Sequence, residues 1–283
     1  MTVEKMAAEA RARLARRFGE REASWMVRMI FEDVKGYSQV DMALNGDRDL
    51  GEATCRRVNE IVDRLLANEP LQYILGHARF YGLDFKVSPA VLIPRPETEE
   101  LVDIIVKDAD GREDLRVLDL GTGSGCIAIA LARNLPFAAV TGIDISADAL
   151  DVARANATTL KARVDFRRGD ILDLHLEPAS LDIIVSNPPY ITRSERSTME
   201  SNVLDHEPAT ALFVPDDDPL KFYTPIYKAA TEALAPGGRL YFELNPLTAD
   251  SLADCMRADG WDNVSIIPDS RKQRRFLSAT RPR

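Results

Sequence analysis

The residues best placed to do chemistry are the pentapeptide Ser-Asn-Pro-Pro-Tyr at positions 186–190, which follows the apolar run Leu181–Val185. That run predicts a short buried strand because β-branched residues dominate it, and the two prolines end it at Asn187. In an α/β sheet, residues just past the carboxyl end of a strand line the ligand crevice. We therefore expect the Asn187 side chain and the Pro188 carbonyl to face a ligand from a stiff loop, since each proline fixes a φ angle.

Two rigid acceptors side by side suit a planar NH2 group. An amide or amino nitrogen whose lone pair is delocalised is a poor nucleophile. Hydrogen bonds from its N–H groups to Asn187 and Pro188 would hold it for in-line attack on a carbon group and offset the charge developing on nitrogen. No strong base is required, and the Tyr190 ring could lie against the substrate plane and exclude water. The alternative is a Pro-Pro turn that merely ends a strand.

A glycine-rich motif lies upstream. Arg116–Leu120 predicts a strand, Cys126–Asn134 predicts a helix, and between them stand Gly121, Thr122, Gly123, Ser124 and Gly125. A dinucleotide fingerprint would have its third glycine at position 126, which is cysteine, so no pyrophosphate need bind here. The glycines instead let the backbone approach a small ligand closely, and Asp119 adds a negative charge near it.

Two further predicted strands end in acidic residues. Val140–Ile143 is followed by Asp144, about 20 residues after the glycines, where a carboxylate can bind both hydroxyls of a ribose. Val164–Arg167 leads to Asp170 and Ile171, which suit an adenine amino group and ring. These strand ends fit a nucleoside without phosphate. S-adenosylmethionine matches, because its sulfonium and amino groups are cationic and its carboxylate can meet helix N-terminal N–H groups.

Composition narrows the class of protein. The chain has 283 residues, 45% hydrophobic and 29% charged, with a net charge of -9, which indicates a globular protein of two domains. The acidic charge disfavours a protein that grips a nucleic acid backbone over a large surface. No apolar run reaches the ~18 residues of a membrane span, and the N-terminus lacks a signal-peptide apolar region, so we expect a cytoplasmic protein. Scattered cysteines and histidines predict neither a disulfide framework nor a metal site.

Residues 1–73 are predicted to form a helical domain. Apolar residues at helical spacing indicate helices over Val3–Phe18, Glu22–Val34 and Asp49–Ala67. The apolar group of the second helix, which includes Trp25, is expected to be core. Because no catalytic constellation occurs here, we interpret this domain as a partner-recognition module.

Residues 74–91 are predicted to be a linker with a β-hairpin, because Arg79–Val87 is aromatic and β-branched around a glycine. Two prolines in the segment 94–99 then force an extended stretch before a helix over about Glu97–Val106, which could cover the mouth of the neighbouring site. From residue 92 to 283, strands and helices alternate, which predicts a parallel sheet with helical crossovers. Its later part comprises helices over Phe222–Leu234 and Ala249–Ala258, a strand over Gly238–Leu244, a closing strand pair over Val264–Ile267 and Phe276–Ala279, and a solvated basic turn over Arg271–Arg275.

Five segments together resemble the peptide chain release factor glutamine methyltransferase family. They are residues 76–87, 94–99 (Pro-Arg-Pro-Glu-Thr-Glu), 119–125, 187–190 and 207–212 (Glu-Pro-Ala-Thr-Ala-Leu). The resemblance covers nearly the whole chain. The Asn-Pro-Pro-Tyr motif is shared with amino methyltransferases of nucleic acids, whereas the segment 94–99 is much more particular to this family.

The resemblance implies a class I S-adenosylmethionine-dependent methyltransferase domain, Rossmann-like with a mostly parallel seven-stranded sheet, after a small all-helical domain. The implied reaction is methylation of the glutamine side-chain amide in the Gly-Gly-Gln motif of class I peptide chain release factors, which tunes translation termination. No metal, membrane or direct nucleic acid binding is implied. By similarity, the methyl donor is held by Asp119, Gly121, Thr122, Gly123, Ser124, Gly125, Asp144, Ile145, Asp170, Ile171 and Asn187. The glutamine amide is held by Asn187, Pro188, Pro189 and Tyr190, with Asn187, Pro188 and Tyr190 as the catalytic residues.

The chain departs from the family pattern in two places. After the strand that ends near Glu243, the family commonly has an acidic residue, a glycine and then a glutamine, whereas this chain has Glu243-Leu244-Asn245-Pro246. Residues 191–206 match weakly. We therefore carry over neither the geometry of the loop after Glu243 nor partner contacts of residues 191–206.

Two other classes of function compete with this interpretation. An adenine or cytosine amino methyltransferase could use the same motif on a flipped base, but the acidic charge and the lack of a separate basic recognition domain disfavour it. A binding module that keeps a donor pocket without catalysis would need a damaged acceptor site, and the motif at 187–190 is intact.

Overall fold

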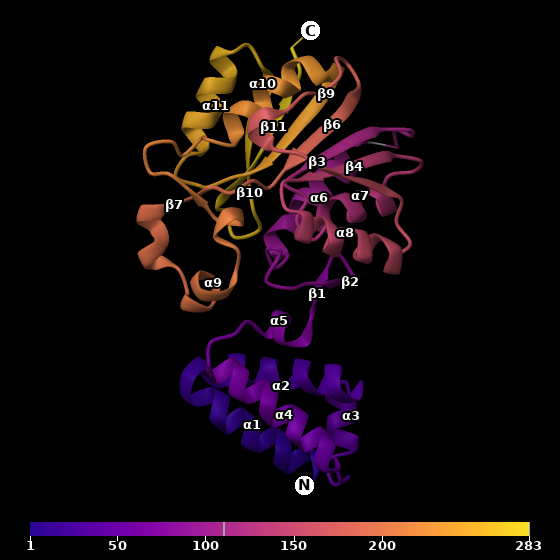
Figure 1. Ribbon diagram of the computed structural model, residues 1–283, viewed down its shortest axis with the longest axis vertical. Coiled ribbons are helices and arrows are strands. Elements are labelled where there is room, and N and C mark those ends of the chain that lie inside the picture. The colour runs from indigo at the N-terminus through magenta and orange to yellow at the C-terminus, as the bar shows by residue number, and fades with distance from the viewer. Residues whose placement is uncertain (110, 283) are drawn as a thin grey trace. The chain divides into compact units, whose positions relative to one another are not determined.

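The computed structural model describes residues 1–109 and 111–282, which belong to two compact units. One unit contains Met1–Gly76 and Glu200–His206, and the other contains His77–Met199 and Glu207–Arg283. Figure 1 shows the first unit as a group of helices and the second as a sheet flanked by helices. In the described part of the chain, no helix is both long enough and apolar enough to cross a membrane.

The first unit is all helical. The three helices expected from the sequence are confirmed as α1 (Val3–Phe18), α2 (Glu20–Lys35) and α4 (Glu52–Leu66). Three short helices were not predicted: α3 (Gln39–Leu44), α5 (Leu71–Leu75) and α9 (Ser201–His206). Thr2 caps the start of α1 by accepting a hydrogen bond from the Lys5 backbone, and Gly36 ends α2 with a φ of 66° that favours glycine.

One prediction about the core of this unit is wrong. Trp25 is 39% exposed, so it is not part of the core. The buried face of α2 consists of Ala23, Met26, Val27, Ile30 and Phe31. These residues recur at intervals of three and four and so share one face of the helix, whereas position 25 lies off that face.

The second unit is built on a seven-stranded sheet with the order β10-β11-β9-β6-β3-β4-β5. The five strands from β9 to β5 are parallel, and β11 runs antiparallel to both β9 and β10, which confirms the predicted mostly parallel, Rossmann-like sheet. The strand bounds are β3 (Arg116–Leu120), β4 (Ala139–Asp144), β5 (Val164–Arg168), β6 (Leu181–Ser186), β9 (Leu234–Glu243), β10 (Asp262–Pro268) and β11 (Arg274–Thr280).

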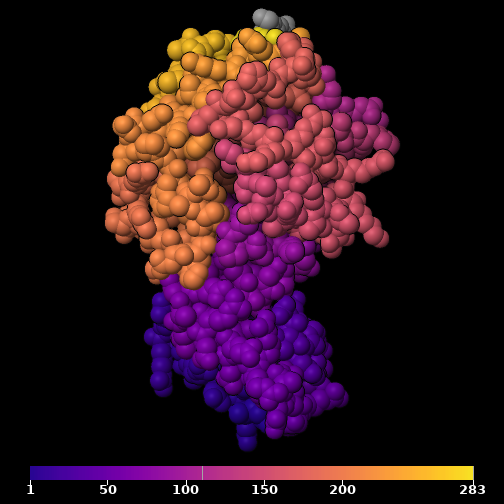
Figure 2. All heavy atoms as spheres, in the orientation of Figure 1, coloured from indigo at the N-terminus to yellow at the C-terminus, as the bar shows by residue number. Residues whose placement is uncertain are grey.

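Helices cover both faces of this sheet (Figure 1). One face is covered by α6 (Pro96–Ala109), α7 (Cys126–Asn134) and α8 (Ala147–Thr159). The other is covered by α10 (Tyr223–Ala233) and α11 (Ala249–Ala258). Strands buried on both faces read as continuous apolar runs, which is why β3 and β6 could be recognised in the sequence. In Figure 2, segments from the early and late parts of this unit, magenta to yellow, share one surface.

The remaining elements are short. The hairpin predicted between residues 79 and 87 is present as β1 (His77–Phe80) and β2 (Leu83–Lys86), and the rings of Phe80 and Phe85 pack edge to face with centroids 5.8 Å apart. A parallel pair, β7 (Ile191–Thr192) and β8 (Phe213–Val214), follows the Asn-Pro-Pro-Tyr motif. Three 3-10 helices span Ile171–Asp173, Arg193–Thr198 and Ala209–Ala211.

Candidate active site

The candidate site lies where the order of the parallel strands reverses. Strand β3 pairs with β4 on one side and with β6 on the other, and chain order moves outward in both directions. In the register, Leu120 at the end of β3 is opposite both Ile143 of β4 and Ser186 of β6. The three predicted motifs therefore leave the sheet at one edge, which is the position of ligand sites in open α/β sheets.

The glycine loop is held by backbone hydrogen bonds to the neighbouring strand. The Gly121 and Thr122 N–H groups both donate to the Ile143 carbonyl, at 2.8 and 2.9 Å between nitrogen and oxygen. Gly125 has a φ of 79°, and a Cβ there would lie 3.0 Å from the Phe166 ring. Glycine is therefore needed at position 125 for both conformation and space.

Asp144 is oriented by two backbone N–H groups. Its Oδ2 accepts from Gly123 at 2.8 Å and its Oδ1 accepts from Ser146 at 2.9 Å. Each carboxylate oxygen has a further lone pair, and the side chain is only half-buried. The carboxylate can therefore accept two more hydrogen bonds, as the vicinal hydroxyls of a ribose would require.

Asp119 lies beneath the glycine loop and is fully buried. Its Oδ2 accepts from the Thr122 hydroxyl at 2.6 Å and from the Ala128 N–H at 3.2 Å. Among the described residues, nothing donates to its Oδ1. Burial raises the pKa of this carboxyl to about 7, with a smaller contribution from the charge of Asp144. A buried acceptor without a donor is suited to a cationic ligand group.

Two large apolar side chains are exposed beside the glycine loop. Ile145 follows Asp144 and is 54% exposed, and Leu172 follows Ile171 and is 46% exposed. Asp170 begins the 3-10 turn by accepting from the Leu172 N–H at 2.9 Å. Ile171 is close to the loop, since its Cδ1 would be 3.6 Å from a Cβ at Gly121. Exposed apolar groups next to polar strand ends suit the faces of an adenine ring. Leu172 was not predicted as a site residue.

The Asn-Pro-Pro-Tyr segment leaves β6 beside the glycine loop. The Ser186 hydroxyl donates to the Leu120 carbonyl at 2.6 Å and joins the ends of β6 and β3. Asn187 is half-buried, and its Nδ2 donates to the Thr98 hydroxyl at 3.3 Å. The Tyr190 hydroxyl donates to Glu243 Oε1 at 3.1 Å, which anchors the far end of the ring. Both ends of the segment are thus held by side chains of other elements.

Thr98, Glu243 and Asn245 are site residues that sequence reasoning did not assign. Thr98 and Glu243 are each 2% exposed, and burial raises the pKa of the Glu243 carboxyl. Asn245 Nδ2 donates to the Tyr190 carbonyl at 3.0 Å and to Glu195 Oε2 at 2.9 Å. The segment that departs from the family pattern therefore supports the loop after Pro189.

Two of the segments that carry the family resemblance contact each other. Glu207 is buried, and its carboxylate accepts from Arg95 Nη2 at 2.5 Å and from the Ile93 N–H at 3.2 Å. This ion pair ties the proline-rich segment before α6 to the segment that follows residue 206. The start of α6, which carries Thr98, is thereby fixed.

The basic segment 271–275 is exposed at residues 271–274, as predicted for a solvated turn, and Arg275 is half-buried. Three of its arginines form ion pairs: Arg271 with Glu97, Arg274 with Asp250, and Arg275 with Asp269. The Asp269 side chain is 1% exposed and that of Arg275 21%. The acidic partners of these arginines lie outside the segment, so its own composition did not predict the ion pairs.

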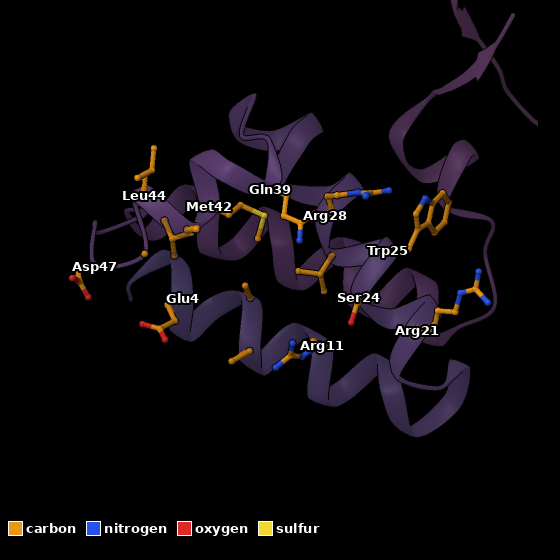
Figure 3. A pocket seen from close by; sticks show the side chains of 16 residues that line it. Glu4, Arg11, Arg21, Ser24, Trp25, Arg28, Gln39, Met42, Leu44 and Asp47 are labelled. Carbon is orange, nitrogen blue, oxygen red and sulfur yellow. The ribbon is translucent and has the colours of Figure 1, made fainter. Parts of the chain in front are cut away.

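The first unit has a groove of its own, with a volume of about 840 Å³ between α1, α2 and α3. Figure 3 shows Arg21 and Trp25 toward one end and Glu4 and Asp47 toward the other. Arg11 and Arg28 also line this groove. It combines cationic side chains with a partly exposed indole, a combination enriched at protein interfaces.

The fold and the strand-end residues of the second unit define an S-adenosylmethionine-dependent methyltransferase. Residues 112–258 match the model of a methyltransferase domain, and residues 6–76 match the PrmC N-terminal domain. A crystal structure of a methyltransferase from Pyrococcus furiosus is similar, with a TM-score of 0.52 and 18% identity, covering 78% of this chain and 98% of that one. This likeness shows the fold.

Relatives in sequence define the family. A release factor glutamine methyltransferase of Bacteroides thetaiotaomicron is 48% identical over 88% of this chain and 89% of its own length. One of Deinococcus radiodurans is 35% identical over 99% of both chains. The chain belongs to the release factor glutamine methyltransferase family. The resemblance seen in the sequence is confirmed, and the cofactor of this enzyme is S-adenosylmethionine.

Proposed function

We propose that this enzyme methylates the side-chain amide nitrogen of a glutamine in peptide chain release factors. The glutamine is that of the Gly-Gly-Gln motif of class I release factors, and its methylation tunes translation termination. The observation that carries the proposal is the Asn-Pro-Pro-Tyr segment at the end of β6, next to the glycine loop at the end of β3. The names of the relatives support the choice of substrate.

The donor pocket is assigned to the glycine loop and its neighbours. Asp144 binds the ribose hydroxyls, and the buried Asp119 provides negative charge for the cationic amino group. The remaining donor-binding residues are Gly121, Thr122, Gly123, Ser124, Gly125, Ile145, Asp170, Ile171 and Asn187. When bound, S-adenosylmethionine supplies an electrophilic methyl group on a sulfonium. The orphaned Asp119 Oδ1 and the exposed Ile145 and Leu172 side chains support this assignment.

The acceptor site is assigned to residues 187–190. The Asn187 side-chain oxygen and the Pro188 carbonyl accept hydrogen bonds from the two N–H groups of the substrate amide. They orient its nitrogen and stabilise the positive charge that grows on it as the methyl group is transferred. One proton then leaves the methylated amide, which needs no strong base because a cationic amide nitrogen is very acidic. Pro189 stiffens the loop, and the Tyr190 ring excludes water.

We assign partner recognition to the helical domain, residues 1–73, with residues 74–91 as the linker to the methyltransferase domain, residues 92–283. The groove with Arg21, Arg28 and Trp25 supports this assignment. We further propose that the enzyme acts in the cytoplasm and does not bind nucleic acid directly. Charge reversal of Arg21 and Arg28 should then raise the KM for the release factor and leave donor affinity unchanged.

The test uses S-adenosylmethionine with a radiolabelled methyl group. The labelled donor is incubated with the full chain and a purified release factor, the same factor with its Gly-Gly-Gln glutamine changed to alanine, bulk DNA or bulk RNA. Label on the intact release factor alone supports both the substrate and the modified residue. Label on nucleic acid alone would refute the proposal in favour of a base amino methyltransferase. Label on both release factor variants would refute the assigned glutamine.

A further inference from the structure

A chain of hydrogen bonds connects Asn187 to three buried or half-buried side chains. Asn187 Nδ2 lies 3.3 Å from the Thr98 hydroxyl oxygen, and that hydroxyl lies 2.7 Å from Glu243 Oε2. The other oxygen of Glu243 accepts from Tyr190 at 3.1 Å. The three elements involved are α6, the loop after β6 and the end of β9. The resemblance to the family assigned no role to Thr98 or to Glu243.

The donors and acceptors in this series of hydrogen bonds can be counted. A threonine hydroxyl has a single proton, whereas its oxygen can accept two hydrogen bonds. When Glu243 is ionised, the form that the nearby charge of Arg275 favours, both of its oxygens act as acceptors, so the Thr98 proton points to Glu243. Thr98 can then only accept from Asn187, and the group that Asn187 turns toward it must be its NH2.

The donors available around Thr98 therefore favour one of the two orientations of the Asn187 amide. The oxygen and the NH2 group of an asparagine are nearly equal in size, so packing alone does not distinguish the two orientations. With the NH2 group bound to Thr98, the side-chain oxygen points away from it. In the opposite orientation, Asn187 would meet the N–H groups of a substrate amide with its own N–H groups. That pairing would lose the hydrogen bond on which the acceptor site depends.

We propose that Thr98 is a positioning residue that, together with Glu243, sets the orientation of the Asn187 amide so that its oxygen accepts from the substrate NH2 group. This inference rests on the proposed acceptor role of Asn187. It also deepens that role, because a site with two fixed acceptors, Asn187 and Pro188, favours a primary amide over a carboxylate. A glutamate in place of the glutamine would bring lone pairs toward lone pairs.

Two substitutions at Thr98 test the effect of its hydroxyl group separately from the effect of its branched shape. Thr98→Val keeps the branched shape and removes the hydroxyl, and Thr98→Ser keeps the hydroxyl. Thr231→Val is the matched control, because the partly buried Thr231 hydroxyl in α10 bonds only the Tyr227 carbonyl of its own helix in the described contacts. With release factor as substrate, we expect kcat of Thr98→Val to fall on the order of tenfold to a hundredfold, as for a lost preorganised contact. Donor Kd should be unchanged, Thr98→Ser should recover most of kcat, and Thr231→Val should match the wild type.

A measurement on the unaltered chain tests the orientation even if Thr98→Val does not fold. The Asn187 side-chain NH2 is assigned by nuclear magnetic resonance from the signal lost in Asn187→Ala. We expect a strong nuclear Overhauser effect between this NH2 and the Thr98 methyl group. Its absence would overturn the proposal, as would normal turnover in folded Thr98→Val or equally slow turnover in Thr98→Ser.

The outcomes distinguish this inference from the proposed function. If the wild type modifies the release factor glutamine and Thr98→Val does so at the same rate, only the role of Thr98 fails. If the wild type does not modify that glutamine, the proposed function fails, and the nuclear Overhauser effect still reports the orientation of Asn187.

Discussion

Donor binding should depend on pH through Asp119. The pKa of this buried carboxyl is raised to about 7, so it is mostly protonated in the ligand-free protein below that pH. A cationic amino group bound nearby favours the ionised form. Binding below pH 7 must therefore release a proton from Asp119, and donor affinity should rise with pH until it levels off above 7.

The size of the effect follows from that pKa. If Asp119 is fully ionised in the complex, the donor affinity changes with pH by the ratio of the ionised fractions of the free protein. Donor binding is then roughly eightfold weaker at about pH 6 than at about pH 7.5. The same raised pKa of Asp119 also makes the free energy of unfolding depend on pH. Between about pH 4 and pH 7 the folded ligand-free protein holds a proton that the unfolded chain has lost, so the contribution of Asp119 to the free energy of unfolding falls as pH rises.

Isothermal titration calorimetry with S-adenosylhomocysteine measures both the affinity and the released proton. Titrations in buffers of different ionisation enthalpy should show proton release at pH 6 that disappears near pH 8. Asp119→Asn is the control, because its amide oxygen can still accept from Thr122 while the group no longer titrates. The donor amino group titrates in both proteins and cancels in the comparison. Equal pH dependence in the two proteins would refute the reasoning.

Three further changes test other parts of the site. Asn187→Ala should lower kcat on the order of a hundredfold and change donor Kd far less; near-normal turnover would contradict the acceptor role. Asp144→Ala should weaken donor binding by about a few kcal/mol at most, since it removes charge-assisted hydrogen bonds; calorimetry that shows an unchanged Kd would exclude Asp144 from the pocket. Gly142→Ala should destabilise the protein by about 1–3 kcal/mol in urea unfolding. A Cβ there would lie 2.8 Å from the Phe166 ring and 2.9 Å from the Thr122 hydroxyl. An unchanged unfolding midpoint would mean that this part of the sheet can relax.

Local sequence patterns determined the elements of the methyltransferase domain and the strand ends that carry its motifs. The predicted bounds of β3, α7 and α11 agree with the structure to the residue. Apolar periodicity, prolines, glycines and caps act over a few residues, so they can be recognised without knowledge of the fold. The resemblance to the family rested on such short segments and is confirmed by the relatives.

Only the tertiary structure decided which side chains support those motifs. Thr98 is 89 residues from Asn187 and 145 from Glu243 in sequence, and nothing local to any of the three indicates a contact. The hydrogen bonds exist because β9 lies beside β6 in the sheet and α6 packs against β9. The exposure of Trp25 has a local cause instead, since position 25 lies off the helix face on which the buried residues recur. Types and spacing of residues predicted the class of chemistry of this enzyme, whereas strand order and helix packing placed Thr98 and Glu243 beside the Asn-Pro-Pro-Tyr segment.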